Sequence, residues 1–101
     1  MIPSDEFDRF CNGQFTSVTL ESGPIVQGYA ARDLQDFRLM RIDGFTLEDD
    51  GRVSQFSLRL EQSQIKAASV LKEPPAVTDL DGTVHRMRSA FWDDEPNIKI
   101  D

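Results

Sequence analysis

Three Asp-Gly pairs occur along the chain and limit the folds that it can adopt. Asp-Gly is among the strongest signals for a tight turn between antiparallel strands, because both central turn positions need a positive φ. Each pair is therefore expected to connect two neighbouring strands. The pairs are Asp43-Gly44, Asp50-Gly51 and Asp81-Gly82. A chain with three such turns is expected to consist mainly of short antiparallel strands.

The segments between these turns have the composition and alternation of β-strands. The clearest alternation lies in 52–61, where Phe56, Leu58 and Leu60 point to one face. Gly28 interrupts an earlier strand and is expected to mark a bulge or a sharp bend. The expected strand segments, in chain order, are 15–22, 25–32, 37–42, 45–48, 52–61, 76–80, 83–91 and 97–100.

Two other segments are expected to be helical. Residues 3–12 predict a short N-terminal helix with Ser4 as its N-cap and acidic residues in its first turn. Its apolar face is formed, at helical spacing, by Phe7, Phe10 and Cys11. Residues 62–72 predict a helical turn, which the Pro74-Pro75 pair ends.

Length and pattern together predict a single domain over residues 1–101. A chain of this size buries roughly 65% of its unfolded surface, which is enough for one core. The expected fold is mainly β, a small antiparallel β-barrel or sandwich of six to seven short strands over 15–101, with the one short helix at 3–12.

The charge of the chain limits its partners. The formal net charge is −7, from 18 acidic and 11 basic residues. This argues against a basic face that binds DNA, although such a surface would let a duplex pass without sticking. The lone Cys11 cannot form an internal disulfide, which fits a reducing compartment. No apolar run approaches the length of a membrane helix and no signal-peptide pattern is present, so a cytosolic protein without a membrane partner is expected.

The string "DLDGT" at residues 79–83 resembles the aspartate signature of the haloacid-dehalogenase-like phosphatases. In that family the first aspartate attacks phosphorus and lies at the end of a buried parallel strand. Here prolines and Thr78 interrupt the approach, and only 18 residues follow Thr83, which leaves no room for βαβ units. The string is therefore interpreted as a hairpin turn.

The other chemical candidates are weak. His85 is the only histidine, so a histidine-rich metal site is excluded, and a half-buried strand position is expected for it. Glu48, Asp49 and Asp50 form an acidic corner that lacks the spacing of a calcium loop, so a solvated turn is expected. No catalytic residue, metal or cofactor is expected, and the chain is not expected to be an enzyme.

Segment 33–47 has more apolar side chains than one face of a short hairpin can bury. Either both faces are covered within the fold, or part of the segment meets another subunit. The interface candidates in this segment are Phe37, Leu39, Met40, Ile42 and Phe45. Arg86 and Arg88 are two further candidates, which would contact phosphate or a partner's carboxylates, or else pair with acids of their own chain.

The order of several segments resembles the head–tail joining proteins of tailed bacteriophages, also called head-completion or stopper connectors. An acidic-aromatic helix comes first, then two strands, a long arm, a central strand with a polar turn, and a hairpin with an Asp-Gly turn. The matching segments are "DEFDRF" (5–10), "TSVTLES" (16–22), "IVQGYAARD" (25–33), the arm 33–51, "SQFSLRLEQSQI" (54–65) and "DGTVHRMRSAFWDD" (81–94).

This resemblance implies a structural protein of the virion, assembled in the cytoplasm of the bacterial host. It would be a monomer when isolated, with mobile segments at the arm 33–51 and at 62–75, and would form a ring, typically of six, at the head–tail junction. Its partners would be the portal or connector protein and tail proteins, and DNA would pass nearby without specific binding. The alternative is a small β-barrel module of bacterial origin that binds a ligand or peptide in a closed apolar pocket.

Overall fold

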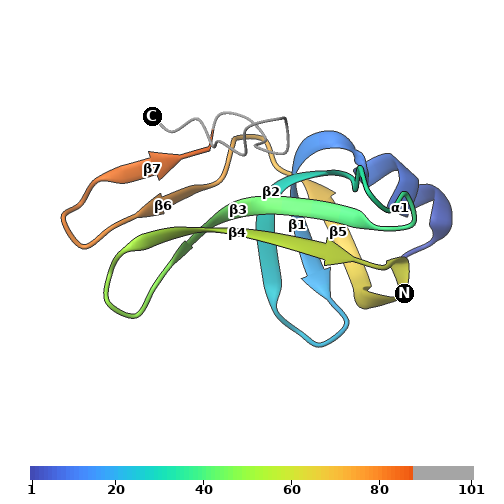
Figure 1. Cartoon of the computed structure of the whole chain (residues 1–101), viewed down its shortest axis with the longest axis horizontal. Coiled ribbons are helices and arrows are strands. Elements are labelled where there is room, and N and C mark those ends of the chain that lie inside the picture. The colour runs from blue at the N-terminus through green and yellow to red at the C-terminus, as the bar shows by residue number, and fades with distance from the viewer. Residues whose placement is uncertain (88–101) are drawn as a thin grey trace.

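The computed structural model of the chain describes residues 1–87, which form a mainly β domain with one short α-helix (Figure 1). The predicted fold class is confirmed, and residues 1–87 contain seven strands. The elements, in chain order, are α1 (Ser4–Phe10), β1 (Asn12–Leu20), β2 (Ile25–Arg32), β3 (Met40–Leu47), β4 (Val53–Leu60), the 3₁₀ turn η1 (Gln62–Gln64), β5 (Ile65–Val70), β6 (Ala76–Thr78) and β7 (Val84–Arg86).

The strands form two antiparallel sheets. The larger sheet has five strands in the order β4-β3-β2-β1-β5, and β6 and β7 form a separate two-stranded sheet. The β6–β7 hairpin extends in the same direction as the β3–β4 hairpin, away from α1 (Figure 1). Within residues 1–87, β4 and β5 are the outer strands of the five-stranded sheet and do not pair with each other. The described strands therefore form open sheets and not a closed barrel.

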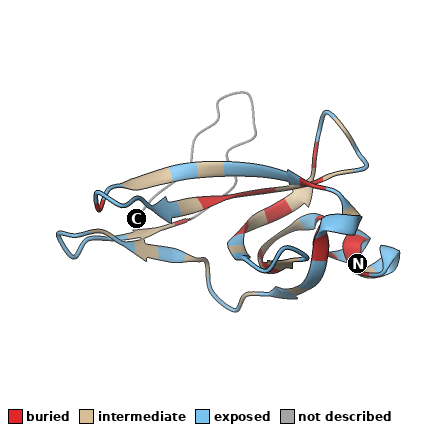
Figure 2. Ribbon diagram, turned by 90° about the horizontal axis from the view of Figure 1, so that it is seen from below, coloured by how far each residue is buried: buried red, intermediate tan, exposed pale blue. Residues whose placement is uncertain are grey.

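One face of the large sheet, covered by α1, holds the main core. The pairing Met40↔Leu60 and Ala30↔Ile42 brings alternate apolar residues of neighbouring strands onto this face. Figure 2 shows most buried positions in and around the half of the molecule that carries α1. The buried members of the cluster are Ile2, Phe7, Phe10, Cys11, Val18, Ala30, Met40, Ile42, Leu60 and Ile65. Each large member stabilises the fold by about 1.5–3 kcal/mol.

The helix face was predicted correctly, but its N-cap was not. Phe7 and Phe10 are buried against the sheet. The helix begins at Ser4 itself, because the Phe7 amide donates to the Pro3 carbonyl oxygen (2.9 Å) and so makes Pro3 the capping residue. The predicted helical span of 3–12 is too long at its C-terminal end, since β1 already starts at Asn12.

A second, smaller cluster lies on the opposite face of the sheet. Met87 is fully buried there and packs against Phe15, Tyr29 and Phe45. The rings of Phe15 and Tyr29 meet edge to face, with centroids 5.2 Å apart. This cluster ties the chain that leaves β7 to the five-stranded sheet.

The predicted turn at Asp43-Gly44 is wrong, because both residues lie inside β3. β3 pairs with β4 without interruption from Met40↔Leu60 to Leu47↔Val53. A Cβ at Gly44 would lie 2.7 Å from the Gln27 carbonyl oxygen, so glycine is needed here for close packing. The predicted turn at Asp50-Gly51 is correct, and Gly51 has the expected positive φ of 84°.

Gly28 also serves close packing and does not form a bulge. It pairs in register with Thr16, and the irregular positions of β1 lie elsewhere, at Asn12/Gln14 and Thr19/Leu20. A Cβ at Gly28 would collide with the Asp43 carbonyl group, whose carbon would be 2.9 Å away. Pairing of β2 with β3 ends at Tyr29↔Asp43, so the two strands separate beyond this contact.

The segment 62–72 is mostly a strand. Only Gln62–Gln64 forms the predicted helical turn, and Ile65–Val70 forms β5, which pairs with β1. Its alanines favour helix locally, but pairing with the β1 edge decides the structure. The predicted strand at 97–100 lies outside the described residues. In the described part of the chain, no helix has the length and hydrophobicity that a membrane crossing needs.

Candidate functional site

The "DLDGT" string forms the turn of the β6–β7 hairpin, as predicted. The Asp79 carboxylate Oδ1 accepts hydrogen bonds from the amides of Asp81 (2.9 Å) and Thr83 (3.0 Å). The Asp79 amide in turn donates to the Thr83 carbonyl oxygen (3.0 Å), and Gly82 has a φ of 84°. An aspartate that bonds the backbone two and four residues ahead is a turn-forming residue.

His85 occupies the other oxygen of the same carboxylate. Its Nε2 lies 2.8 Å from Asp79 Oδ2, and its ring is partly buried on β7, as predicted. This contact, followed by the bond from the Thr83 amide, holds the pKa of Asp79 below its ordinary value. Both oxygens of the candidate nucleophile are thus engaged in their own hairpin, and that hairpin is antiparallel, unlike the parallel strand of the phosphatase family.

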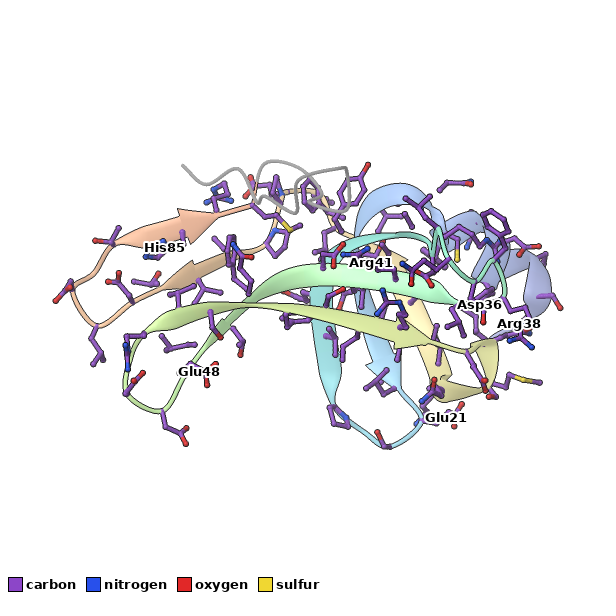
Figure 3. The ribbon with its side chains drawn as sticks, in the orientation of Figure 1. Glu21, Asp36, Arg38, Arg41, Glu48 and His85 are labelled. Carbon is purple, nitrogen blue, oxygen red and sulfur yellow. The ribbon has the colours of Figure 1, made fainter. Side chains whose placement is uncertain are left out.

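The acidic corner before β4 is likewise engaged within its own turn. The Arg52 guanidinium pairs with Asp50 (2.8 Å), and the Ser54 hydroxyl donates to Glu48. Among the described residues, no group of three histidine, cysteine or acidic side chains is placed to hold a metal ion. Glu48 and His85 lie at the hairpin end of the molecule, far from Asp36 and Arg38 (Figure 3).

The tips of the two hairpins contact one another. A Cβ at Gly51 would collide with the side chain of Leu80, so Leu80 lies directly over the β3–β4 turn. A surface cleft of about 430 Å³ lies between the tips. It is lined by Asp50, Gly51, Arg52, Val53, Asp79, Leu80, Asp81 and His85. The sequence gives no signal for this contact, because it joins two turns about thirty residues apart.

The five interface candidates of segment 33–47 differ in exposure. Met40 and Ile42 are fully buried in the main core and therefore do not lie on the surface. Phe45 is partly buried in the second cluster and Leu39 is partly exposed. Phe37 is 70% exposed. The structure thus favours the alternative in which the segment is covered on both faces for residues 40–45, whereas Phe37, in the loop before β3, is exposed.

The predicted arm at 33–51 is not an arm, because its centre is β3. What remains is the loop 33–39, which we call the β2–β3 loop. Leu34 and Phe37 project from it and are 60% and 70% exposed. We call this pair the apolar knob.

Arg86 is engaged within its own chain. Its Nη1 donates to the Pro74 carbonyl oxygen (3.1 Å) and lies 4.0 Å from the Glu73 carboxylate. It therefore anchors the segment that precedes β6. Arg88, the other predicted interface arginine, lies outside the described residues.

A cluster of charged side chains near the junction of β2, β3 and β4 was not predicted. Asp43 is fully buried and pairs with Arg41 (3.2 Å), and Asp33, also buried, pairs with Arg59 (3.3 Å). Burial raises the pKa of Asp43, and Ser57 and Arg41 offset this only in part. The cluster was not predicted because these charged residues alternate with apolar ones in the sequence, and such alternation is typical of a strand with one face in solvent.

An apolar groove of about 450 Å³ lies where β2 and β3 separate beyond Gly28. Its walls come from the first residues of β2, from the distal halves of β3 and β4, and from β6. None of the residues within 1–87 that line it is charged. They are Ile25, Val26, Gln27, Phe45, Thr46, Phe56, Leu58, Pro75, Ala76 and Val77. The sequence did not predict the groove, because it forms between segments distant in the chain.

Comparison of the chain with protein-family models, with curated proteins and with solved structures gave no match. The similarity to head–tail joining proteins therefore stays a prediction from the sequence. The apolar knob and the apolar groove are the two surfaces on which a function can be argued.

Proposed function

We propose that this chain is a non-enzymatic structural subunit that assembles into a ring and joins the head of a tailed bacteriophage to its tail. One observation carries the proposal: large apolar side chains are exposed at two opposite ends of the domain. The β2–β3 loop lies beside α1 at one end, and the hairpin tips form the other (Figure 1). The exposed residues at the first end include Leu34 and Phe37, and those at the second are Leu47, Leu80 and Val84, while Ile25, Leu58 and Val70 are exposed elsewhere on the large sheet.

Surfaces at opposite ends of one copy meet only in different copies. A head-to-tail contact of this kind closes into a ring when the rotation between neighbours allows it, and gives a filament when it does not. Exposed apolar patches on a small domain are a common mark of such contacts. The arrangement therefore supports self-assembly, and the order of sequence features supports the head–tail junction as its place.

The charge of the chain fits a ring around a DNA channel. Each copy has a formal net charge of −7, so several copies around a channel repel phosphates. Salt limits this repulsion to roughly 8–10 Å from the wall, which lets DNA pass without binding. The engagement of Asp79 in its own turn supports a role without catalysis.

The experiment that tests this proposal is sedimentation of the full chain, alone and mixed with purified portal-side connector rings or tail proteins. We expect a monomer in the first sample and several copies on each ring in the second. Rings without the chain and the chain without rings provide the two reference sizes. Failure to associate with either partner would overturn the proposal.

A second candidate function is a module that binds a ligand or an extended peptide. It is favoured by the apolar groove, whose volume is within the range of about 300–1,000 Å³ for ligand sites. In that case an apolar peptide or ligand would shift the amide resonances of Val26 and Phe45, and the chain would stay monomeric in every mixture.

A further inference from the structure

We propose that the apolar groove of one copy receives the apolar knob, Leu34 and Phe37, of a second copy. This inference rests on the self-assembly proposed above and names the two surfaces that make the contact. It commits the groove to one occupant, which is the β2–β3 loop of a neighbouring subunit.

The groove has the size and chemistry for this occupant. An apolar cavity of about 150 Å³ is enough for a benzene ring. The groove is about three times larger, at about 450 Å³, and its lining includes Ile25, Phe45 and Leu58. It can therefore hold the ring of Phe37 with Leu34 beside it. In the described part of the chain no charged side chain lines the groove, so docking of the knob removes no charge of these residues from water.

The knob is held in place before it binds. The Asp33 amide donates to the Leu39 carbonyl oxygen (3.0 Å), which closes the loop at its base. The Arg32 guanidinium donates to the Phe37 carbonyl oxygen (3.1 Å) and to the Asp8 carboxylate of α1 (2.7 Å). An ordered loop loses little conformational entropy when it docks.

The charges beside the knob are paired with one another. Asp36 and Arg38 form a two-point ion pair within the loop, with contacts of 3.0 and 2.9 Å. These bonds hold the pKa of Asp36 at about 2. The knob thus presents apolar side chains next to a locally neutral pair, which matches a groove without charged residues.

A copy cannot place its knob in its own groove. β2 begins at the groove and ends at the β2–β3 loop, so the two surfaces lie at opposite ends of one strand. About seven residues of extended chain separate Val26 from Asp33, which is roughly 20 Å. The contact therefore joins two copies through different surfaces, as a ring requires.

The size of the contact accounts for a monomer in isolation. Two large side chains and the walls around them bury on the order of 600 Å², whereas a stable complex buries about 1,200–2,000 Å². The knob and groove alone are thus too weak to hold copies together in dilute solution. When a partner ring holds several copies side by side, the effective concentration of one copy's knob at its neighbour's groove is high, and the two surfaces then bind.

Disulfide trapping tests the contact directly with the full chain. The Gln35→Cys variant, which places a thiol beside Leu34 and leaves the apolar knob intact, is mixed with the Thr46→Cys variant, which places a thiol in the groove wall. The mixture is oxidised with and without connector rings. The native Cys11 can stay, because burial raises its pKa to about 11 and keeps its thiol protonated and enclosed. The matched control pairs Gln35→Cys with Lys66→Cys, an exposed position of β5.

We expect the Gln35→Cys and Thr46→Cys pair to cross-link at least about tenfold faster than the control pair, a ratio equivalent to ~1.4 kcal/mol. Equal rates in the two pairs, in a sample that still forms oligomers, would overturn the knob-and-groove contact and leave the ring proposal standing. If no oligomer forms under any condition, both proposals fail. The three substituted positions are exposed, so unchanged thermal unfolding curves verify that the variants fold.

A second measurement uses substitutions in place of cross-links. Phe37→Ser should reduce the number of copies bound per connector ring, because it removes the aromatic part of the knob. Val70→Ser, at another exposed apolar position, on β5, should leave that number unchanged. Equal loss in both variants would contradict a specific role for the knob.

Discussion

At the scale of single residues, the buried acid Asp43 has the clearest consequence for solution behaviour. Burial raises its pKa above the ordinary value, so the folded state holds a proton more tightly than the unfolded state. The ordinary pKa of an aspartate, which applies in the unfolded state, is about 4. As the pH rises from this value to the higher pKa of the folded state, the contribution of Asp43 to the free energy of unfolding therefore falls.

The Asp43→Asn variant should lack this pH dependence. Urea unfolding from pH 4 to pH 7 should show that the stability of the wild type, relative to the variant, decreases as the pH rises. Asp36→Asn is the matched control, because hydrogen bonds from Arg38 lower the pKa of Asp36 to about 2. The contribution of Asp36 should be lost only as the pH falls below about 4. The same pH profile in both variants would contradict the assignment.

Gly28 provides a second test at this scale. In Gly28→Ala the new Cβ would meet the backbone of Asp43, which cannot move without breaking the β2–β3 pairing. We expect the free energy of unfolding to fall by about 3 kcal/mol, the upper end of the range for overpacking. Gln27→Ala, at the exposed neighbouring position, should change it by less than about 0.5 kcal/mol. Chemical denaturation of both variants makes the comparison, and similar losses would refute the close-packing role.

At the scale of elements, the β6–β7 hairpin depends on Asp79. Asp79→Ala removes the acceptor of the Asp81 and Thr83 amides and the partner of His85. We expect these two amides to exchange with solvent on the order of tenfold faster, since local opening becomes easier. Asp81→Ala should leave the exchange rates nearly unchanged, because the backbone amide of Asp81 makes the bond. Unchanged exchange in Asp79→Ala would show that the turn does not need the carboxylate.

The strands and turns also show which parts of the fold could be predicted from the sequence. Alternation and turn residues predicted β2 at its observed bounds and the turns at Asp50-Gly51 and Asp81-Gly82. The turn predicted at Asp43-Gly44 was wrong, because this pair has the local sequence of a turn. Its glycine is instead needed for the close approach of Gln27, which is visible only in the folded structure. β5 was missed for a similar reason, since an alanine-rich segment becomes a strand only beside the free edge of β1.

The candidate site was predicted only in part. The sequence marked Phe37 as an interface residue together with Met40 and Ile42, because all three are apolar and close in the chain. Exposure separates them: Phe37 lies in the β2–β3 loop, whereas the other two point from β3 into the core. The groove could not be predicted at all, because it depends on how β2 and β3 separate at Gly28.

At the scale of the whole molecule, the two ends of the domain have different surfaces, and this is what self-assembly into a ring needs. The end beside α1 presents a knob fixed by hydrogen bonds, and the region where β2 separates from β3 presents a groove whose described lining residues are uncharged. The same asymmetry would produce an open filament if the angle between neighbours did not close. The number of copies in the assembly is therefore the quantity that distinguishes these outcomes.

Native mass spectrometry of the complex between the full chain and purified connector rings tests the central claim most directly. The account predicts one dominant mass, with a fixed number of copies that completes a ring, and no such mass for the chain alone. Single bound copies, or a ladder of masses without a preferred number, would contradict a closed ring of these subunits.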